Sequence, residues 1–99
     1  MPKLKQPELT DDQVQLIAKA LADPRRYMIL RHLTGCDNAI SCSDVLECAG
    51  ISPATLSHHM KELEMAGLIQ PVRKGKFVSY LTRREVLNAY LKKVKADLF

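Results

Sequence analysis

Two groups of residues in the second half of the chain have the chemistry that nucleic-acid binding uses. The first begins at Ser52-Pro53, a cap residue followed by proline, where free backbone N–H groups at the positive end of a helix suit a phosphate. The first side chains of this helix are short or hydrogen-bonding and can approach base edges in a major groove. Those of His59 and Lys61 could reach a base or the DNA backbone. The candidate DNA contacts on this helix are Ser52, Ala54, Thr55, Ser57, His58, His59 and Lys61.

The pair His58-His59 has two alternative interpretations, a surface pair without function and a metal pair. Adjacent residues on a helix point about 100° apart, so a chelate shared by the two imidazoles is geometrically poor. We therefore favour DNA contact for these residues.

The second group is a set of cations around a glycine, in a segment with the pattern of a hairpin connection. Arg73, Lys74 and Lys76 flank Gly75 and would contact phosphates, because each neutralised phosphate releases a counterion. The formal charge of the chain is +4, but residues 1–70 carry seven Lys/Arg and nine Asp/Glu, whereas residues 71–99 carry eight and two. The positive charge thus belongs to the last third. Charge alone leaves a solvated basic face without a partner as an equal alternative.

Three cysteines, Cys36, Cys42 and Cys48, recur every six residues. Their odd number argues against a structural disulfide framework. We expect Cys48 to pack as a small apolar residue and Cys36 to be the most exposed. Cys36 and Cys42 flank a loop and could form a redox couple, or the three thiols could bind a thiophilic ion such as As(III). An unrelated small-molecule or protein effector, and no effector at all, remain as alternatives.

Periodicity and capping residues predict the elements that position these groups. The predicted helices cover residues 11–22, 24–34, 43–49 and 53–66, and the predicted strands cover residues 68–72 and 77–81. Thr82 with Glu85 forms a capping box that opens a closing helix. The expected fold is mainly α with a small β-hairpin (α+β), a winged helix-turn-helix of about five helices and a two-stranded wing.

Three stretches of the chain then follow a known pattern in its order. Residues 21–30 read LADPRRYMIL, residues 56–63 read LSHHMKEL, and residues 66–80 begin AGLI and continue through KGK to a tyrosine. They resemble the "LADPTRxxIL" opening, the "xSHHLxxL" recognition helix and the "AGLV…R.GR…Y" wing of the ArsR/SmtB family of winged-helix repressors. This resemblance covers about residues 16–81. It implies a homodimer that binds a palindromic operator in double-stranded DNA and represses transcription until an effector binds.

The sensing sites of that family are not matched. One site usually has a Cys-x-Cys pair in "ELCVCDLA", but here Ser41 and Ser43 stand at the expected thiols and Cys42 lies between them. The site on the closing helix needs Asp and His residues at helical spacing, and this stretch contains no histidine. Serine hydroxyls are poor ligands for soft metals. We therefore assign no metal site and no certain cofactor, and retain As(III) or another thiophilic ion at the three cysteines as a hypothesis.

The chain is short enough for one domain, which we place at residues 10–99 after a tail at residues 1–9. No apolar run approaches the roughly 20 residues of a membrane span and no signal peptide opens the chain, so we expect a cytoplasmic protein without a membrane partner. The first and last helices would form the dimer surface, with Val14, Ile17, Leu21, Val86, Tyr90, Leu91 and Val94.

Three classes of function compete for this sequence. A homodimeric repressor released by an effector, thiol-reactive such as As(III) or an oxidant, is the leading hypothesis. The alternative is a winged-helix protein-interaction module without operator recognition, since a fold does not dictate function. We expect no enzyme and no catalytic residue, because the sequence shows no nucleophile–base pair, phosphate-binding glycine loop or metal-ligand set.

Overall fold

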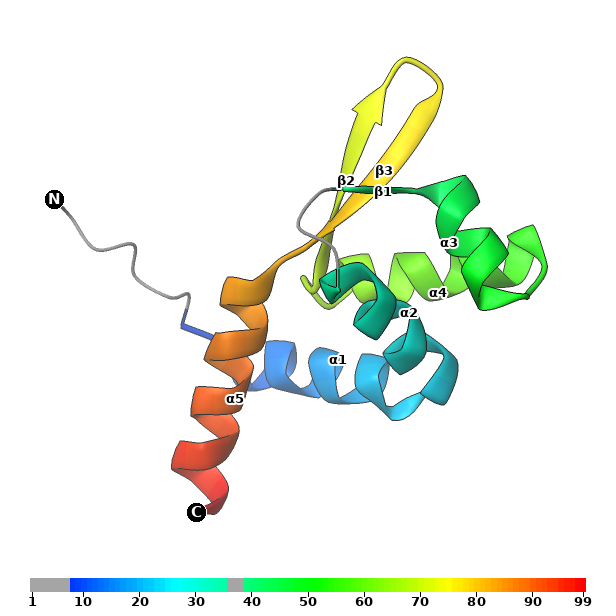
Figure 1. Cartoon of the computed structure of the whole chain (residues 1–99). Coiled ribbons are helices and arrows are strands. Elements are labelled where there is room, and N and C mark those ends of the chain that lie inside the picture. Colours follow the sequence, from blue (N-terminus) through cyan, green and yellow to red (C-terminus); the bar gives the residue numbers. More distant parts are fainter. Residues whose placement is uncertain (1–7, 36–38) are drawn as a thin grey trace, which may run out of the picture.

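The computed structural model describes residues 8–35 and 39–99, which form five helices and one three-stranded sheet (Figure 1). The helices are α1 (Asp11–Ala22), α2 (Pro24–Thr34), α3 (Cys42–Ala49), α4 (Pro53–Met65) and α5 (Arg84–Leu98). The strands are β1 (Ile40–Ser41), β2 (Ile69–Lys74) and β3 (Phe77–Thr82). No helix within these described ranges is long and apolar enough to cross a membrane.

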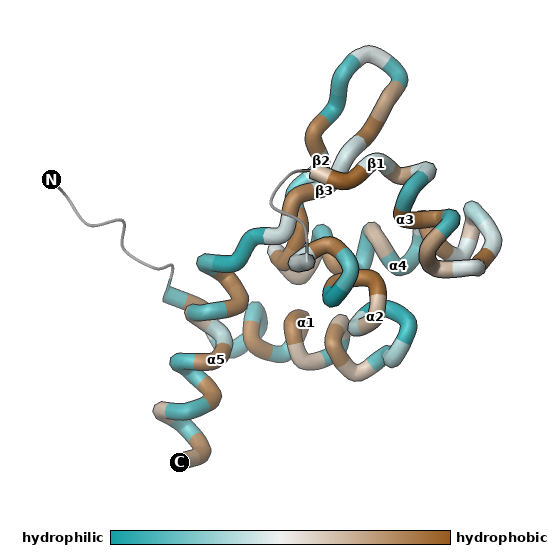
Figure 2. The backbone as a smooth tube through the Cα atoms, viewed as in Figure 1, coloured by the Kyte–Doolittle hydropathy of each residue, from teal (hydrophilic) through white to brown (hydrophobic). Residues whose placement is uncertain are grey.

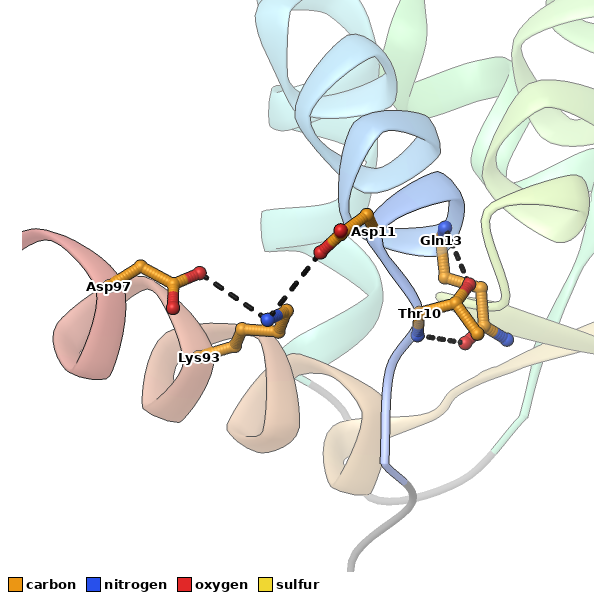
Figure 3. A network of polar contacts seen from close by, with 5 residues as sticks. All are labelled: Thr10, Asp11, Gln13, Lys93 and Asp97. Carbon is orange, nitrogen blue, oxygen red and sulfur yellow. Dashed lines mark hydrogen bonds and ion pairs between the residues drawn. The ribbon is translucent and has the colours of Figure 1, made fainter.

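Side-chain caps fix where the first helices begin. Thr10 Oγ1 accepts a hydrogen bond from the Gln13 amide at 3.2 Å, and Gln13 Oε1 accepts one from the Thr10 amide at 2.9 Å (Figure 3). This confirms the capping box expected for α1. At the next corner Asp23 accepts from the backbone amides of Arg25 and Arg26 and so caps α2.

The corner between α1 and α2 is closed from the other side by Arg26. Its Nε donates to the carbonyl of Ala20 at 3.0 Å and its Nη2 donates to the carbonyl of Lys19 at 3.2 Å. Both carbonyls belong to the last turn of α1, where no intrahelical donor remains for them. One arginine side chain therefore caps the end of the helix before it.

The core lies between α1, α2, α3, α4 and the base of the sheet. Its largest fully buried side chains come from α1, α3, α4, the residue before β2 and the start of β2, and they are Ile17, Val45, Leu56, Leu63, Leu68 and Ile69. The chain leaves α4 through Gly67, whose φ of +79° favours glycine. The Leu68 amide then donates to the Leu63 carbonyl at 3.0 Å, so the start of the wing is held against the end of α4.

The sheet has three strands in the order β1-β3-β2, all antiparallel. The predicted two-stranded wing is confirmed as β2 and β3, but β1 pairs with β3 as well, Ile40 opposite Tyr80 and Ser41 opposite Ser79. A two-residue strand shows no alternation of apolar and polar residues, so the sequence pattern could not reveal it.

The capping box predicted at Thr82 and Glu85 is wrong. Thr82 is the last residue of β3, opposite Ile69, and the Arg83 amide donates to the Leu68 carbonyl at 2.8 Å. Because the ladder continues past Thr82, α5 begins only at Arg84, and Arg83 at its N-cap makes no side-chain cap hydrogen bond. Glu85 instead accepts from Arg83 Nε at 3.0 Å.

The end of α5 projects away from the rest of the molecule, and hydrophobic and hydrophilic residues are interspersed along it (Figures 1 and 2). Lys93 Nζ lies 3.6 Å from a carboxylate oxygen of Asp11 and 3.4 Å from one of Asp97, which ties α5 to the start of α1 (Figure 3). Leu91 is 63% exposed and Leu98 is 76% exposed. This helix therefore presents apolar side chains that the described residues do not cover.

Candidate nucleic-acid interface

The helix α4 has one buried and one exposed face, and the residues of each face recur at the 3.6-residue period of a helix. One stripe is buried and consists of Leu56, His59, Met60 and Leu63. The opposite stripe is exposed and consists of Ala54, Ser57, His58 and Lys61, at the spacing i, i+3, i+4, i+7. Four of the seven sequence-predicted contacts on this helix therefore share one solvent-facing side.

His59 does not belong to that side, and its predicted DNA contact is wrong in this structure. Its side chain is 5% exposed, and both ring nitrogens lack a hydrogen-bond partner among the described residues. Burial lowers the pKa of the imidazole, an effect that the nearby Asp23 carboxylate partly opposes. A neutral, core-facing ring cannot reach a base edge. The signal was available in the sequence, because His59 follows Leu56 by three residues and precedes Leu63 by four.

The start of α4 is held by its own side chains. Ser52 Oγ accepts from the Thr55 amide at 3.2 Å and donates to Thr55 Oγ1 at 2.8 Å. Both hydroxyls are therefore engaged in a helix cap, and Thr55 is half-buried. Pro53 has no N–H to donate, so the Ala54 amide is a backbone donor at this end that a phosphate could use.

The wing places its three cations at an exposed tip. Lys74 lies opposite Phe77 in the last pair of the ladder, and Arg73 lies opposite Val78 one step before. Gly75 has a φ of +59°, which suits the first position of a two-residue hairpin turn. Arg73, Lys74 and Lys76 are exposed, and none of them forms an ion pair or side-chain hydrogen bond with another described residue. These charges are available to a polyanion.

The two described cysteines occupy different environments. Cys42 is half-buried at the start of α3, where it packs against the core, and Cys48 is exposed. The expectation that Cys48 packs in the core is wrong, because the buried face of α3 is centred on Val45. Cys36 lies outside the described residues. Ser41, at one of the expected thiol positions, caps α3 by accepting from the Asp44 amide at 3.2 Å.

Cys42 and Cys48 do not converge within one chain. Six residues of helix separate them by about 9 Å along the axis and about 240° around it. A single thiophilic ion cannot bind both thiols of one α3 at ordinary metal–sulfur distances, so the geometry does not support a three-thiol site for As(III) within one chain. Within the described residues no group of three or more His, Cys, Asp or Glu could hold a metal ion.

Cys48 borders an open cleft between α2 and α3, which could not be predicted from the sequence because it depends on how these two helices pack. Apolar residues from both helices form most of its wall, and Arg25 and His32 lie at its side. The lining residues are Arg25, Met28, Ile29, His32, Val45, Cys48, Ala49 and Ile51. A molecule in this cleft would contact α3, the first helix of the helix-turn-helix.

The predicted dimer residues divide between core and surface. Ile17 and Val86 are buried within the chain, so they are corrected from interface to core residues. Leu21 and Tyr90 are half-buried and pack against the same core, and Val14 and Val94 are also half-buried. Leu91 is exposed as a dimer contact requires. Two exposed leucines were not among the predicted dimer residues, Leu16 on α1 and Leu98 near the end of α5.

These features together define a class of protein. Two helices, α3 and α4, joined by a turn with Gly50 in the left-handed region, are followed by a charged β-hairpin. The exposed side of the second helix carries short and hydrogen-bonding side chains. This is the arrangement of a winged helix-turn-helix DNA-binding domain.

Comparison with known proteins agrees with this class. A family model described as a helix-turn-helix domain matches residues 21–72. The transcriptional repressor SdpR of Bacillus subtilis is 38% identical over 71 residues, 72% of this chain and 77% of the relative. The arsenical resistance operon repressor of Staphylococcus xylosus is 37% identical over 76 residues, 77% of this chain and 71% of the relative.

A solved structure is also similar over most of the chain. It is the homodimeric winged helix-turn-helix DNA-binding domain of a possible ArsR-family transcriptional regulator from Mycobacterium bovis, with a TM-score of 0.68 and 27% identity over 90% of this chain and 88% of that one. The chain belongs to the ArsR/SmtB family of winged-helix transcriptional regulators.

Proposed function

We propose that this protein is a homodimeric repressor that binds a palindromic operator through α4 and the wing of each protomer. The observation that carries the proposal is the exposed stripe of Ala54, Ser57, His58 and Lys61 on a helix whose opposite side is core. That stripe enters the major groove, where Ser57 and His58 form hydrogen bonds with base edges.

The phosphate contacts come from the wing and from the ends of α4. Arg73, Lys74 and Lys76 bind the backbone beside the groove, and Lys61 adds a fourth cation on the same helix as the base contacts. Four cations in each of two protomers would neutralise eight phosphates, so the logarithm of the association constant falls with the logarithm of salt concentration with a slope of about −7. Contacts through cations set affinity, and those of Ser57 and His58 set sequence preference.

The dimer forms through the outward side of α5 together with α1. Leu91 and Leu98 leave large apolar surfaces in solvent, and a second copy that covers them removes this cost. The homodimeric state of the similar M. bovis domain supports this assembly. A two-fold dimer places its two α4 helices on half-sites about 34 Å apart, which is why the operator is palindromic.

Release from DNA by an effector is the remaining part of the proposal. Cys48 is the described thiol that an oxidant or a thiophilic reagent reaches from solvent, and its cleft touches α3. A group added there alters the packing of α2 against α3, and α3 supports α4. The exposure of Cys48, with Cys42 half-buried and on another side of α3, supports a role for single-thiol chemistry over a three-thiol chelate.

The experiment begins with selection of an operator from a randomised duplex pool by the wild-type protein. Gel shifts then compare the wild type with Ser57→Ala/His58→Ala and with the exposed control Lys19→Ala, which lies on α1 outside the proposed interface. We expect the double variant to lose at least about 10³-fold in affinity for the selected operator and little for random DNA, since each good base contact contributes about 1–3 kcal/mol and the dimer loses four of them. A pool that yields no preferred sequence contradicts operator recognition and favours a protein-interaction module.

A further inference from the structure

The wing tip contains a large apolar residue among its cations. Phe77 is 71% exposed, although it lies next to Lys76 and opposite Lys74 in the last pair of the β2–β3 ladder. Cations at this tip are explained by phosphate binding, but a phenyl ring is not. The hairpin projects from the rest of the molecule (Figures 1 and 2), so a partner that meets its tip would contact both the cations and this water-exposed ring.

The register of the hairpin keeps this ring away from the core. Residues directly opposite one another share a face of a sheet, and successive residues alternate between faces. Ile69 and Tyr80, which pack in or against the core, lie on the face that also bears Arg73. Phe77, Lys74 and Leu81 lie on the other face. The ring therefore stands on the outer face of the wing, at its far end.

We propose that Phe77 inserts into the DNA minor groove beside the major groove that α4 occupies, and partly unstacks one base step there. The inference rests on the proposed function, since it requires that α4 and the wing bind duplex DNA. Lys74 and Lys76 hold the phosphates that border this groove, and Phe77 fills the space between them. Apolar side chains that enter the minor groove act as wedges and bend the duplex toward the major groove.

Such a wedge adds sequence preference at a position without base hydrogen bonds. Pyrimidine–purine steps such as TA and CA/TG unstack more easily than other steps. The selected operator is therefore expected to carry one of these steps under each wing, outside the bases read by Ser57 and His58. The wing then contributes to specificity as well as to affinity.

The test uses the full chain and the operator selected by the wild type, with 2-aminopurine placed at successive steps on each side of the half-sites. Wild-type binding should raise the fluorescence at one step per half-site, because unstacking relieves the quenching of this base. Phe77→Ala should abolish the rise and lower affinity by about tenfold, and Phe77→Leu should retain part of both. Leu81→Ala is the matched control, since Leu81 is 36% exposed on the same face but farther from the tip.

Salt dependence separates this inference from the proposed function. Phe77 carries no charge, so Phe77→Ala should leave the salt slope unchanged, whereas Lys74→Ala/Lys76→Ala should make it shallower by about 3 to 4 in the dimer. Tight, salt-dependent binding by the wild type with no fluorescent step, and with Phe77→Ala within twofold of the wild type, overturns the wedge and leaves the repressor proposal standing. A change in oligomeric state, or in binding to anionic vesicles, in place of the DNA effects would likewise overturn it.

Discussion

Replacement of His59 by leucine should make the protein more stable, although it removes a polar residue from the helix proposed to recognise DNA. His59 is buried and its two ring nitrogens have no hydrogen-bond partner among the described residues. An unsatisfied buried polar group costs about 1–3 kcal/mol. Leucine matches the neighbours Leu56, Met60 and Leu63 and is close in size, so His59→Leu should raise the free energy of unfolding by about 1–2 kcal/mol at pH 7.5.

The same substitution should remove a dependence of stability on pH. Burial lowers the pKa of His59 below its ordinary value of 6.5, so between these two pKa values the unfolded chain binds more protons than the folded one. Stability is therefore complete above pH 6.5 and falls as the pH falls toward the lowered pKa. One proton can change the free energy of unfolding by at most about 1.4 kcal/mol per pH unit. The groups that act on this ring are Asp23, Arg25, Arg26 and His58.

Urea unfolding between pH 5 and pH 8, at one fixed protomer concentration, measures both effects. His58→Leu is the control, since it changes an exposed histidine one position away and should alter stability by less than about 0.5 kcal/mol. His59→Leu should be more stable at every pH, with a flatter profile between pH 6.5 and 5. A destabilised variant, or one with the wild-type pH profile, would refute the argument that an unpaired ring in the core is responsible.

Three further predictions concern the corner, the dimer surface and the thiols. Arg26→Ala should lower the free energy of unfolding by about 2 kcal/mol, because it removes two charged donors from the carbonyls of Ala20 and Lys19. Thermal melts would measure this loss, and the control Arg25→Ala should have a much smaller effect in them. Leu91→Asp/Leu98→Asp should convert the protein to a monomer in sedimentation, whereas Leu81→Asp on the wing should not; a dimeric double variant would exclude α5 as the interface. In a Cys36→Ser background, iodoacetamide should alkylate Cys48 about tenfold faster than Cys42, as followed by mass spectrometry, because only Cys48 is exposed; equal rates would contradict the orientation of α3.

The sequence predicted most elements because their ends carry side chains with a local task. The start of α1 follows from the Thr10 capping box, and α2 begins one residue after its Asp23 cap. These interactions join residues two or three positions apart, so a sequence pattern contains them in full. The predicted start of α5 was wrong because it depends on a long-range contact. The Arg83 amide donates to the carbonyl of Leu68, which lies 15 residues earlier. A local capping pattern at Thr82 does not reveal that the β2–β3 hydrogen bonds continue to Arg83 and so delay the start of the helix.

The candidate site was predictable to the extent that its residues follow helical period. Ala54, Ser57, His58 and Lys61 share an exposed side because they follow one another by three or four residues. His59 was assigned to the interface by its residue type, whereas its spacing from Leu56 and Leu63 placed it in the core. The partial burial of Cys42 and the exposure of Cys48 depend on which side of α3 meets α2 and α4. This is a tertiary property that a helix of eight residues does not encode alone.

The placement of the two proposed interfaces has a consequence for how an effector acts. One side of α4 is the surface proposed to bind DNA, and the other packs on a core that α4 shares with Ile17 and Ala20 of α1. The helix α1 is also tied to α5 through the pair of Asp11 and Lys93. Packed helices therefore connect the proposed DNA-binding surface to the proposed dimer surface. In the proposed dimer, the distance between the two α4 helices is set by how α4 packs on α1 within each protomer and by how α1 and α5 meet the partner. For the proposed operator, with half-sites about 34 Å apart, we expect a small change in packing at α2 and α3 to misalign one α4 with its groove.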